Sequence, residues 1–224
     1  MDTPNPQTTD EQLMRRCFAL AMKSAKHGEY PYGSVIVCNG KVVAETTNRV
    51  AHDRDVTRHA EVVAISAAQK ATDSTSLEDC TLYTNMEPCA FCSYAIRESR
   101  IARVVFATRS PIMGGMSRWN ILGDQELSAT MPEVFAPPPD VVPDFLAEEA
   151  EATLLQSAPF MWAFVREGGV LDARLARLAD SGQAGKDLAT KPAGVAGAKD
   201  RLMRFLRRNF FDRFGRGRTT SGRS

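Results

Sequence analysis

The chain has 224 residues, 43% of them hydrophobic, which is enough apolar side chain for one sizeable core and a short appendage. It contains no run of about 18 apolar residues, and its N-terminus lacks the basic and then apolar pattern of a secretory signal. We therefore expect a soluble, cytoplasmic protein. Residues 1–170 carry 15 Lys and Arg against 22 Asp and Glu, a net charge of −7, whereas residues 171–224 carry 13 against 5, a net charge of +8. An acidic body repels polyanions such as RNA, whereas a basic tail attracts them, so the two parts of the chain favour different partners.

The five cysteines are odd in number and too sparse for a secreted disulfide scaffold. We expect the thiols to stay reduced, so that two of them can bind a metal. Cys17, Cys38 and Cys80 fall in apolar segments and are expected to be core residues.

The first predicted element is an amphipathic helix over residues 11–26, which Gly28 ends. The segment SVIVCNGKVVAE predicts strands near 34–38 and 41–47, joined by a two-residue turn at Asn39-Gly40. Four further segments then alternate as helix, strand, helix and strand: RHAEVVAISAAQKA, TLYTN, CAFCSYAIRES and ARVVFAT. Such alternation is typical of an α/β sheet with parallel crossovers, to which the hairpin adds an antiparallel edge.

A long loop rich in Gly, Met and Pro is expected over 109–132, and a loop of that length often covers a functional site as a lid. One short strand at most is expected in PEVFAPPPDVV, and a helix with an acidic face in DFLAEEAEATLL. The sequence thus predicts a disordered N-terminus over 1–9, a catalytic domain over 10–168, and a linker with a flexible basic tail over 169–224.

His59, Cys89 and Cys92 supply one imidazole and two thiolates, a set that suits zinc and leaves a fourth position for water. Pro88 can start a helix there, whose N-terminus would favour the thiolate form of cysteines in the first turn. Positions i and i+2 inside a helix point about 200° apart, so His59 and Glu61 can converge on one site only at a helix start. Glu61 is then expected beside the zinc-bound water, as a proton carrier rather than a ligand.

These residues resemble the signature H-x-E…P-C-x-x-C of the zinc-dependent cytidine and deoxycytidylate deaminase superfamily. The resemblance covers about residues 10–108 and is strongest to the branch with bacterial tRNA adenosine deaminase, guanine deaminase and fungal cytosine deaminase. Segments that recur in that branch are matched here by PYGSVIV, TNR and SRIARVVF. The resemblance implies a three-layer α/β/α sandwich with a mixed central sheet, one catalytic Zn²⁺, and a homodimer.

The resemblance also implies substrate contacts. Asn48 matches a position that hydrogen-bonds the substrate, and the backbone carbonyl of Glu87 matches one that receives the leaving amino group. Ala60, Pro88 and Phe91 complete the predicted substrate-binding set. This chain has DVTRHAE where the tRNA enzyme has D-P-T-A-H-A-E, and its SPIMGGMSRWNIL stretch matches neither that enzyme nor guanine deaminase. The reaction class is therefore expected to transfer better than the substrate.

The expected function is hydrolytic deamination of a purine or pyrimidine base or nucleoside, by zinc-hydroxide attack on the ring carbon with Glu61 as proton shuttle. One alternative is conversion of adenosine to inosine in a tRNA anticodon loop, for which the basic tail would have to supply the positive charge. An alternative of another class is an inactive zinc scaffold that binds RNA or a membrane surface through the tail.

Several residues have a second interpretation. A structural zinc site would take a fourth ligand from the set Cys38, Cys80, His27 and His52. Asn48 could make a local turn, and Phe91 and Tyr32 could pack in the core instead of on a substrate ring. Arg58 could bind an anionic group such as phosphate or remain solvated. Trp119 and Trp162 are candidate walls of a pocket, and the tail is either an amphipathic helix or disordered.

Overall fold

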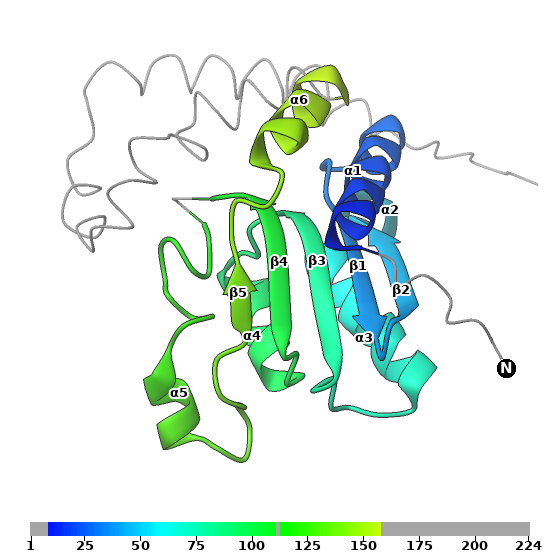
Figure 1. The fold of residues 1–224 in the computed structure, drawn as a ribbon. Coiled ribbons are helices and arrows are strands. Elements are labelled where there is room, and N and C mark those ends of the chain that lie inside the picture. The colour runs from blue at the N-terminus through cyan, green and yellow to red at the C-terminus, as the bar shows by residue number, and fades with distance from the viewer. Residues whose placement is uncertain (1–8, 111–112, 158–224) are drawn as a thin grey trace, which may run out of the picture. The chain divides into compact units, whose positions relative to one another are not determined.

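The computed structural model describes residues 9–110 and 113–157 (Figure 1). The predictions for residues 1–8, for Trp162 and for the linker and tail lie outside the described residues. The helices and strands follow one another as α1 Asp10–Lys26, β1 Gly33–Cys38, β2 Lys41–Thr47, α2 Val50–Asp53, α3 Ala60–Thr72, β3 Cys80–Met86, α4 Ala90–Glu98, β4 Arg103–Thr108, α5 Gln125–Thr130, β5 Asp140–Val142 and α6 Ala147–Ser157.

The strands form one mixed five-stranded sheet in the order β2-β1-β3-β4-β5. Strand β1 pairs antiparallel with both β2 and β3, whereas β3, β4 and β5 are parallel to one another. The predicted turn between β1 and β2 is confirmed, because Asn39 and Gly40 have φ angles of 49° and 74°, the positive values of a tight two-residue hairpin turn.

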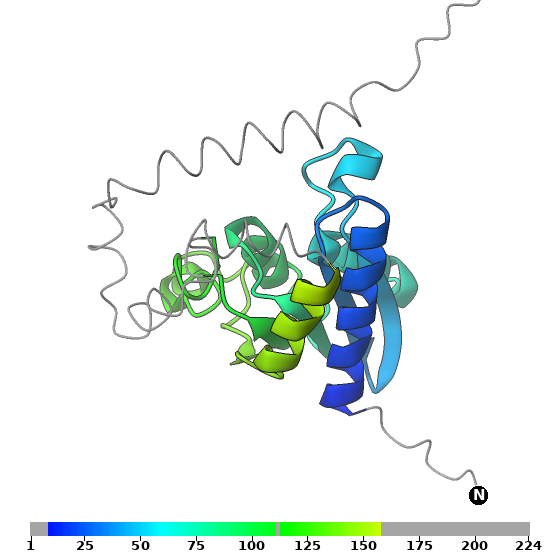
Figure 2. The same ribbon diagram turned by 90° about the horizontal axis from the view of Figure 1, so that it is seen from above.

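Helices cover both faces of the sheet, as Figures 1 and 2 show. On one face α3 and α4 pack against Ile36, Leu82 and Phe106. On the other face α1 and α6 pack against Val35, Tyr83 and Val105. The strand residues alternate between the two clusters, as the pleat requires. The predicted three-layer α/β/α sandwich is thereby confirmed.

Helix α1 forms where the apolar spacing predicts it. Leu13, Met14, Cys17 and Phe18 are buried on its inner face. The side chain of Thr9 accepts a hydrogen bond from the Gln12 backbone N–H, and the Gln12 side chain accepts one from the Thr9 N–H, so a capping box starts the helix.

Several features differ from the sequence predictions, among them the short helix α2, for which no helix was expected. Cys38 and Cys80 are core residues, as predicted, but they are joined in a disulfide instead of staying reduced. Their strands are antiparallel neighbours in a register that sets the two residues directly opposite each other. The short helix α5, inside the long loop after β4, was not predicted; Asp124 caps it by accepting hydrogen bonds from the Glu126 and Leu127 N–H groups.

Within the described part of the chain, the helices are too short or too polar to cross a membrane.

Candidate metal centre and active site

Two helix starts meet at one end of the sheet, beyond the last residue of β3. His59 is the N-cap residue of α3, and Glu61 lies in the first turn of that helix, as the spacing requires. Cys89 is the N-cap residue of α4, and Cys92 lies in its first turn. The expectation that Pro88 starts the helix was wrong by two residues, because the backbone of Cys89 is still extended.

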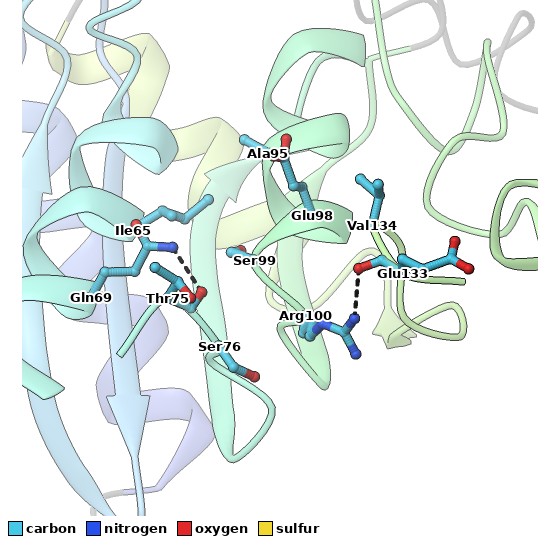
Figure 3. Close-up of a pocket in the computed structure, with 10 residues that line it drawn as sticks. All are labelled: Ile65, Gln69, Thr75, Ser76, Ala95, Glu98, Ser99, Arg100, Glu133 and Val134. Carbon is cyan, nitrogen blue, oxygen red and sulfur yellow. Dashed lines mark hydrogen bonds between the residues drawn. The ribbon is translucent and has the colours of Figure 1, made fainter. Parts of the chain in front are cut away.

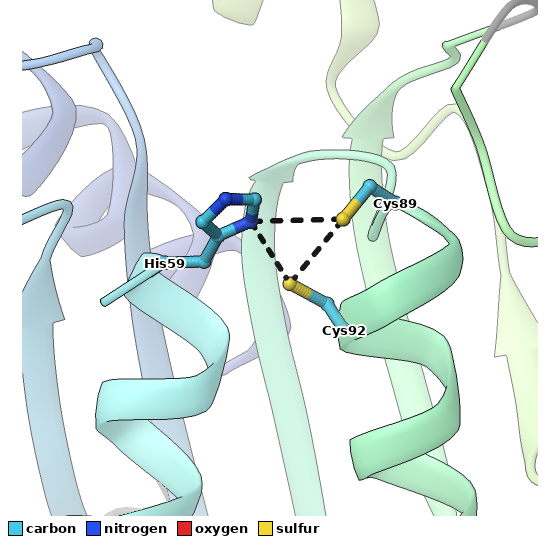
Figure 4. Close-up of side chains that lie close together, drawn as sticks. All are labelled: His59, Cys89 and Cys92. Atoms are coloured by element: carbon cyan, nitrogen blue, oxygen red, sulfur yellow. Dashed lines mark hydrogen bonds between the residues drawn. The ribbon is translucent and has the colours of Figure 1, made fainter. Parts of the chain in front are cut away.

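The three predicted ligand atoms face one another (Figure 4). His59 Nδ1 lies 3.6 Å from Cys89 Sγ and 3.4 Å from Cys92 Sγ, and the two sulfur atoms are 3.6 Å apart. Ligands bound about 2.0–2.3 Å from a tetrahedral zinc lie about 3.5–3.8 Å from one another. The side chains therefore fit a zinc ion with little movement.

Two neighbouring thiolates would give the site a negative charge that a cation can balance. In the site without metal, the hydrogen bond from Cys92 is the main cause that lowers the pKa of Cys89 to about 4, and His59 contributes. The same pairing with Cys89, together with burial, raises the pKa of the Cys92 thiol. Two thiolates this close in a buried site are stable only beside a positive ion, which zinc would supply.

Glu61 is 6% exposed and stands next to the ligands without belonging to their group. Burial, followed by the negative charge of Cys89, raises the pKa of its carboxyl to about 7. A carboxyl with a pKa near 7 can both accept and donate a proton at neutral pH. This is the behaviour expected of a general acid and base.

The interpretation as a four-ligand structural site finds no support in the described residues. Cys38 and Cys80 are bonded to each other. His27 Nδ1 lies 2.8 Å from the Lys23 carbonyl oxygen, and His52 Nδ1 lies 2.7 Å from Asp53 Oδ1. Among the described residues the group that could hold a metal comprises His59, Cys89 and Cys92, and the fourth position for water stays a prediction.

Asn48 is 2% exposed, and its orientation is fixed by a residue that the sequence did not reveal. Its Nδ2 donates a hydrogen bond of 2.8 Å to Glu29 Oε2. Glu29 also accepts from the backbone N–H groups of Ala51 and His52, so it ties the start of α2 to Asn48. With Nδ2 engaged, the amide oxygen of Asn48 is the group left to accept a hydrogen bond.

The other predicted substrate contacts surround the ligands. The Ala60 carbonyl accepts a hydrogen bond of 2.7 Å from Thr46, and the Pro88 carbonyl accepts one of 2.8 Å from the Gly115 N–H. The Phe91 ring is 46% exposed and meets the His59 ring edge-on at 5.7 Å. Tyr32 stacks on Tyr30, with ring centroids 6.0 Å apart. Contact of these residues with substrate stays a prediction.

Arg58 is not a free cation, because its Nε donates to Asp53 Oδ2 at 3.1 Å. Trp119 is 55% exposed, with the Arg118 guanidinium 4.9 Å from its ring centre. Its role as a pocket wall stays a prediction.

The model for the cytidine and deoxycytidylate deaminase zinc-binding region matches residues 7–108. The tRNA-specific adenosine deaminase of Aquifex aeolicus is 36% identical over 119 residues, which is 53% of this chain and 79% of that enzyme. The chain belongs to this deaminase family. The prediction of a zinc-dependent deaminase is confirmed at that level.

Relatives of this chain carry the names of deaminases with more than one substrate. The guanine deaminase of Bacillus subtilis is 41% identical over 98 residues, which is 43% of this chain and 63% of that enzyme. A solved structure from a study of A-to-I editing by tRNA:A34 deaminases is 28% identical, with a TM-score of 0.55, and covers 64% of this chain and 99% of its own. The chain covers 9% of the chloroplastic tRNA(adenine(34)) deaminase of Arabidopsis thaliana and 80% of the tRNA-specific adenosine deaminase of Haemophilus influenzae.

The first part of the loop after β4 is anchored by Glu87, which lies two residues before Cys89 and has a buried carboxylate. Glu87 Oε1 accepts hydrogen bonds from the N–H groups of Met116 at 3.0 Å and Ser117 at 2.6 Å. Its Oε2 accepts from the Ser110 N–H and from the Ser117 hydroxyl, both at 2.7 Å. The family resemblance implied a role for the backbone carbonyl of Glu87 and none for this side chain.

Arg97, which is 1% exposed, anchors the far part of the same loop. Its Nη1 donates to the carbonyl oxygens of Ile121 and Asp124, and its Nη2 donates to the Ser128 hydroxyl and the Ala136 carbonyl. Burial lowers the pKa of this guanidinium. The loop is therefore attached to both ends of the segment from Glu87 to Arg97.

A cavity of about 510 Å³ lies elsewhere, between α3, α4 and residues 133–134 (Figure 3). Gln69 donates to the Thr75 carbonyl on one side of it, and Arg100 donates to the Glu133 carbonyl on the other. Its lining contains neither a metal ligand nor a predicted substrate contact. The candidate active site is therefore chosen by its side-chain chemistry.

Proposed function

We propose that the protein is a zinc-dependent hydrolytic deaminase of a small purine or pyrimidine base or nucleoside. The observation that carries the proposal is a buried carboxyl, Glu61, beside three convergent zinc ligands. A site that only stabilised the fold would not need a titratable group there. A buried carboxyl beside the bound water is suited to proton transfer at each step of a deamination.

In this proposal His59, Cys89 and Cys92 hold the zinc. Bound there, zinc would lower the pKa of a water molecule and so supply the nucleophile. Glu61 accepts a proton from the attacking water and donates it to the ring nitrogen next to the carbon under attack. It then transfers the second proton of that water to the departing amino group, which leaves as ammonia.

The remaining side chains bind and orient the ring. The amide oxygen of Asn48 accepts a hydrogen bond from the substrate, because Glu29 engages the amide nitrogen. Phe91 presents an exposed ring edge-on to His59, in a position to contact an aromatic substrate. These roles are supported by placement at the site.

Charge favours a small substrate over RNA. Helix α6 exposes Glu148, Glu149 and Glu151, and Arg15 pairs with only one of them, Glu149. RNA binding draws much of its affinity from contacts between basic side chains and phosphates, and an acidic helix opposes it. The Bacillus subtilis relative is a guanine deaminase, which supports the small-molecule reading.

The second candidate is deamination of adenosine in a tRNA. The Aquifex aeolicus relative, of which the chain covers 79%, is named a tRNA-specific adenosine deaminase. The excess positive charge of residues 171–224 would supply the phosphate contacts.

The test is ammonia release by the zinc-loaded protein from adenine, guanine, cytosine and their nucleosides, with a tRNA anticodon stem-loop in parallel. Release from one base or nucleoside supports the proposal, provided that Glu61→Gln lowers the rate by about a hundredfold or more and retains zinc. Inosine in the stem-loop, with no release from the small molecules, would replace the first candidate by the second. Removal of residues 180–224 should leave turnover of a small molecule unchanged and abolish turnover of the stem-loop.

A homodimer is also part of the proposal. Helix α4 exposes two aromatic side chains next to the metal centre, Phe91 and Tyr94, at 46% and 45%. Sedimentation velocity of the full chain measures the oligomeric state directly.

A further inference from the structure

The side chain of Glu87 occupies a position that the proposed reaction does not use. Glu87 lies two residues before Cys89, is 2% exposed, and points its carboxylate at the loop after β4. Three backbone N–H groups and one hydroxyl donate to it at 2.6–3.0 Å. A buried carboxylate costs free energy unless it is fully hydrogen-bonded, and here every partner comes from the loop.

The loop is built to approach this carboxylate closely. A Cβ atom at Gly114 would overlap the Glu87 carboxylate, so a side chain at position 114 cannot enter without moving one of the two segments. A Cβ at Gly115 would overlap the Ser93 hydroxyl in the same way. Both glycines are therefore required for contact between the loop and the metal-binding turn.

The same stretch of loop runs along the ligand itself. Gly114 forms an isolated β-bridge with Cys89. On either side of it, the Ala90 N–H donates to the Met113 carbonyl at 3.2 Å, and the Gly115 N–H donates to the Pro88 carbonyl at 2.8 Å. A shift of the turn Gly114–Ser117 would therefore be transmitted to the backbone that holds the Cys89 sulfur.

We propose that the Glu87 side chain is a positioning residue, whose carboxylate fixes the turn Gly114–Ser117 against Cys89 and thereby sets the placement of that metal ligand. Its role in turnover rests on the function proposed above. Removing a group that holds a metal ligand in place, without itself binding the metal, typically lowers metal affinity or activity by about 10- to 100-fold.

The principal variant is Glu87→Gln, which keeps the shape but places an NH₂ group against at least one of the N–H donors. The complementary variant is Gly114→Ala, which disturbs the same contact from the loop. The matched control is Gly123→Ala, because its Cβ would meet only the end of the exposed Asn120 side chain. Circular dichroism and thermal melting establish that each variant is folded before it is compared.

Two measurements are made on each protein. The first is the visible spectrum of the Co²⁺-substituted form, normalised to bound cobalt, which reports the geometry of the thiolate ligands whether or not a substrate is known. The second is kcat and KM of the zinc form. We expect Glu87→Gln and Gly114→Ala to shift the cobalt bands and to lower kcat by about 10- to 100-fold. Gly123→Ala should match the wild type in both.

Wild-type cobalt bands and kcat in folded Glu87→Gln would overturn the proposal. Should Glu87→Gln not fold, Gly114→Ala and the milder Ser117→Ala, which removes one of the four contacts, decide in its place, and wild-type cobalt bands in both would overturn it equally. If the wild type releases no ammonia from any compound, the proposed function fails, and the cobalt spectra still decide the role of Glu87.

Discussion

The two helix starts that carry the candidate ligands and the loop after β4 are held in place by different means. At the helix starts local sequence is enough, because an imidazole, two thiols and a carboxyl converge where two helices begin. The loop has little regular structure of its own and is fixed by hydrogen bonds to Glu87 and Arg97. A candidate metal centre can thus be built from a few local residues, while the loop beside it depends on buried charged residues elsewhere in the chain.

The largest effect is expected from breaking the ligand set. Cys92→Ala removes a thiolate from the first turn of α4, so zinc content and turnover should both fall below detection. The matched control is Ser93→Ala, at the neighbouring position, which should retain about one zinc per chain. Zinc is measured by atomic emission and turnover by ammonia release. A Cys92→Ala protein that retains zinc would contradict the assignment of ligands.

A change outside both the helix starts and the loop after β4 should lower the stability of the fold and leave turnover nearly unchanged. The disulfide Cys38–Cys80 closes a sequence separation of 42 residues at the opposite end of β3 from the metal centre. Its reduction should lower the free energy of unfolding by about 4 kcal/mol and the melting temperature by about 10 °C, with kcat within about twofold of the oxidised protein.

The measurement is a melting curve with and without a phosphine reductant, and the double variant Cys38→Ala/Cys80→Ala should not respond to the reductant. Thiol titration of the denatured, metal-free protein should find three free thiols, those of Cys17, Cys89 and Cys92. A count of five would disprove the disulfide.

The loop is tested by Arg97→Met, which strips the donors from three backbone carbonyls and a hydroxyl. The free energy of unfolding should fall by about 3 kcal/mol, and hydrogen exchange over residues 121–136 should accelerate while zinc stays bound. Arg100→Met is the control, because Arg100 contacts the Glu133 carbonyl of the same loop from a more exposed position, and its loss should cost less than about 1 kcal/mol. Equal exchange rates in both variants would show that Arg97 does not anchor the loop.

The smallest effect is expected at Asp10, which lies outside both regions. The hydrogen bond from Arg103 lowers the pKa of Asp10 below its usual value. A lowered pKa means that the ion pair stabilises the folded state above the pKa of the unfolded chain, and that this contribution is lost as the pH falls through the folded-state pKa. Asp10→Asn should therefore cost about 1 kcal/mol at pH 7.

The melting-temperature difference between Asp10→Asn and the wild type should then shrink below about pH 4, measured on metal-free protein in both cases. Asp140→Asn is the control, because Asp140 is 73% exposed and lies 3.6 Å from Arg103. A difference that grows on acidification would contradict the sign of the effect.

Most of the sheet and the centre of the site were predictable, since they depend on local pattern. The apolar spacing of residues 11–26 predicted α1, and Asn39-Gly40 predicted the hairpin. The rule that His59 and Glu61 can converge only at a helix start correctly placed both at the beginning of α3. These inferences need only the periodicity of a helix or a strand and the properties of one turn.

What the sequence did not reveal depends on which segments become neighbours. Pairing of Cys38 with Cys80 requires β1 and β3 to be adjacent and in one particular register, which periodicity does not specify. Glu87, Arg97 and Glu29 are charged residues, a type that is mostly exposed in proteins, yet each is buried with partners farther along the chain. Their roles follow from burial, which only the assembled fold discloses.

The double anchoring of the loop has a consequence for how this protein can change. Met113 and Trp119 are more than half exposed, at 53% and 55%. Met113 lies between Ser110 and Met116, which both donate to Glu87, and Trp119 lies between the last Glu87 contact and the first Arg97 contact. Substitutions at these two positions change the surface near the metal centre without removing either anchor. A randomised library restricted to them should yield mostly folded, zinc-loaded proteins, and it is the natural starting point for altering substrate preference in the laboratory.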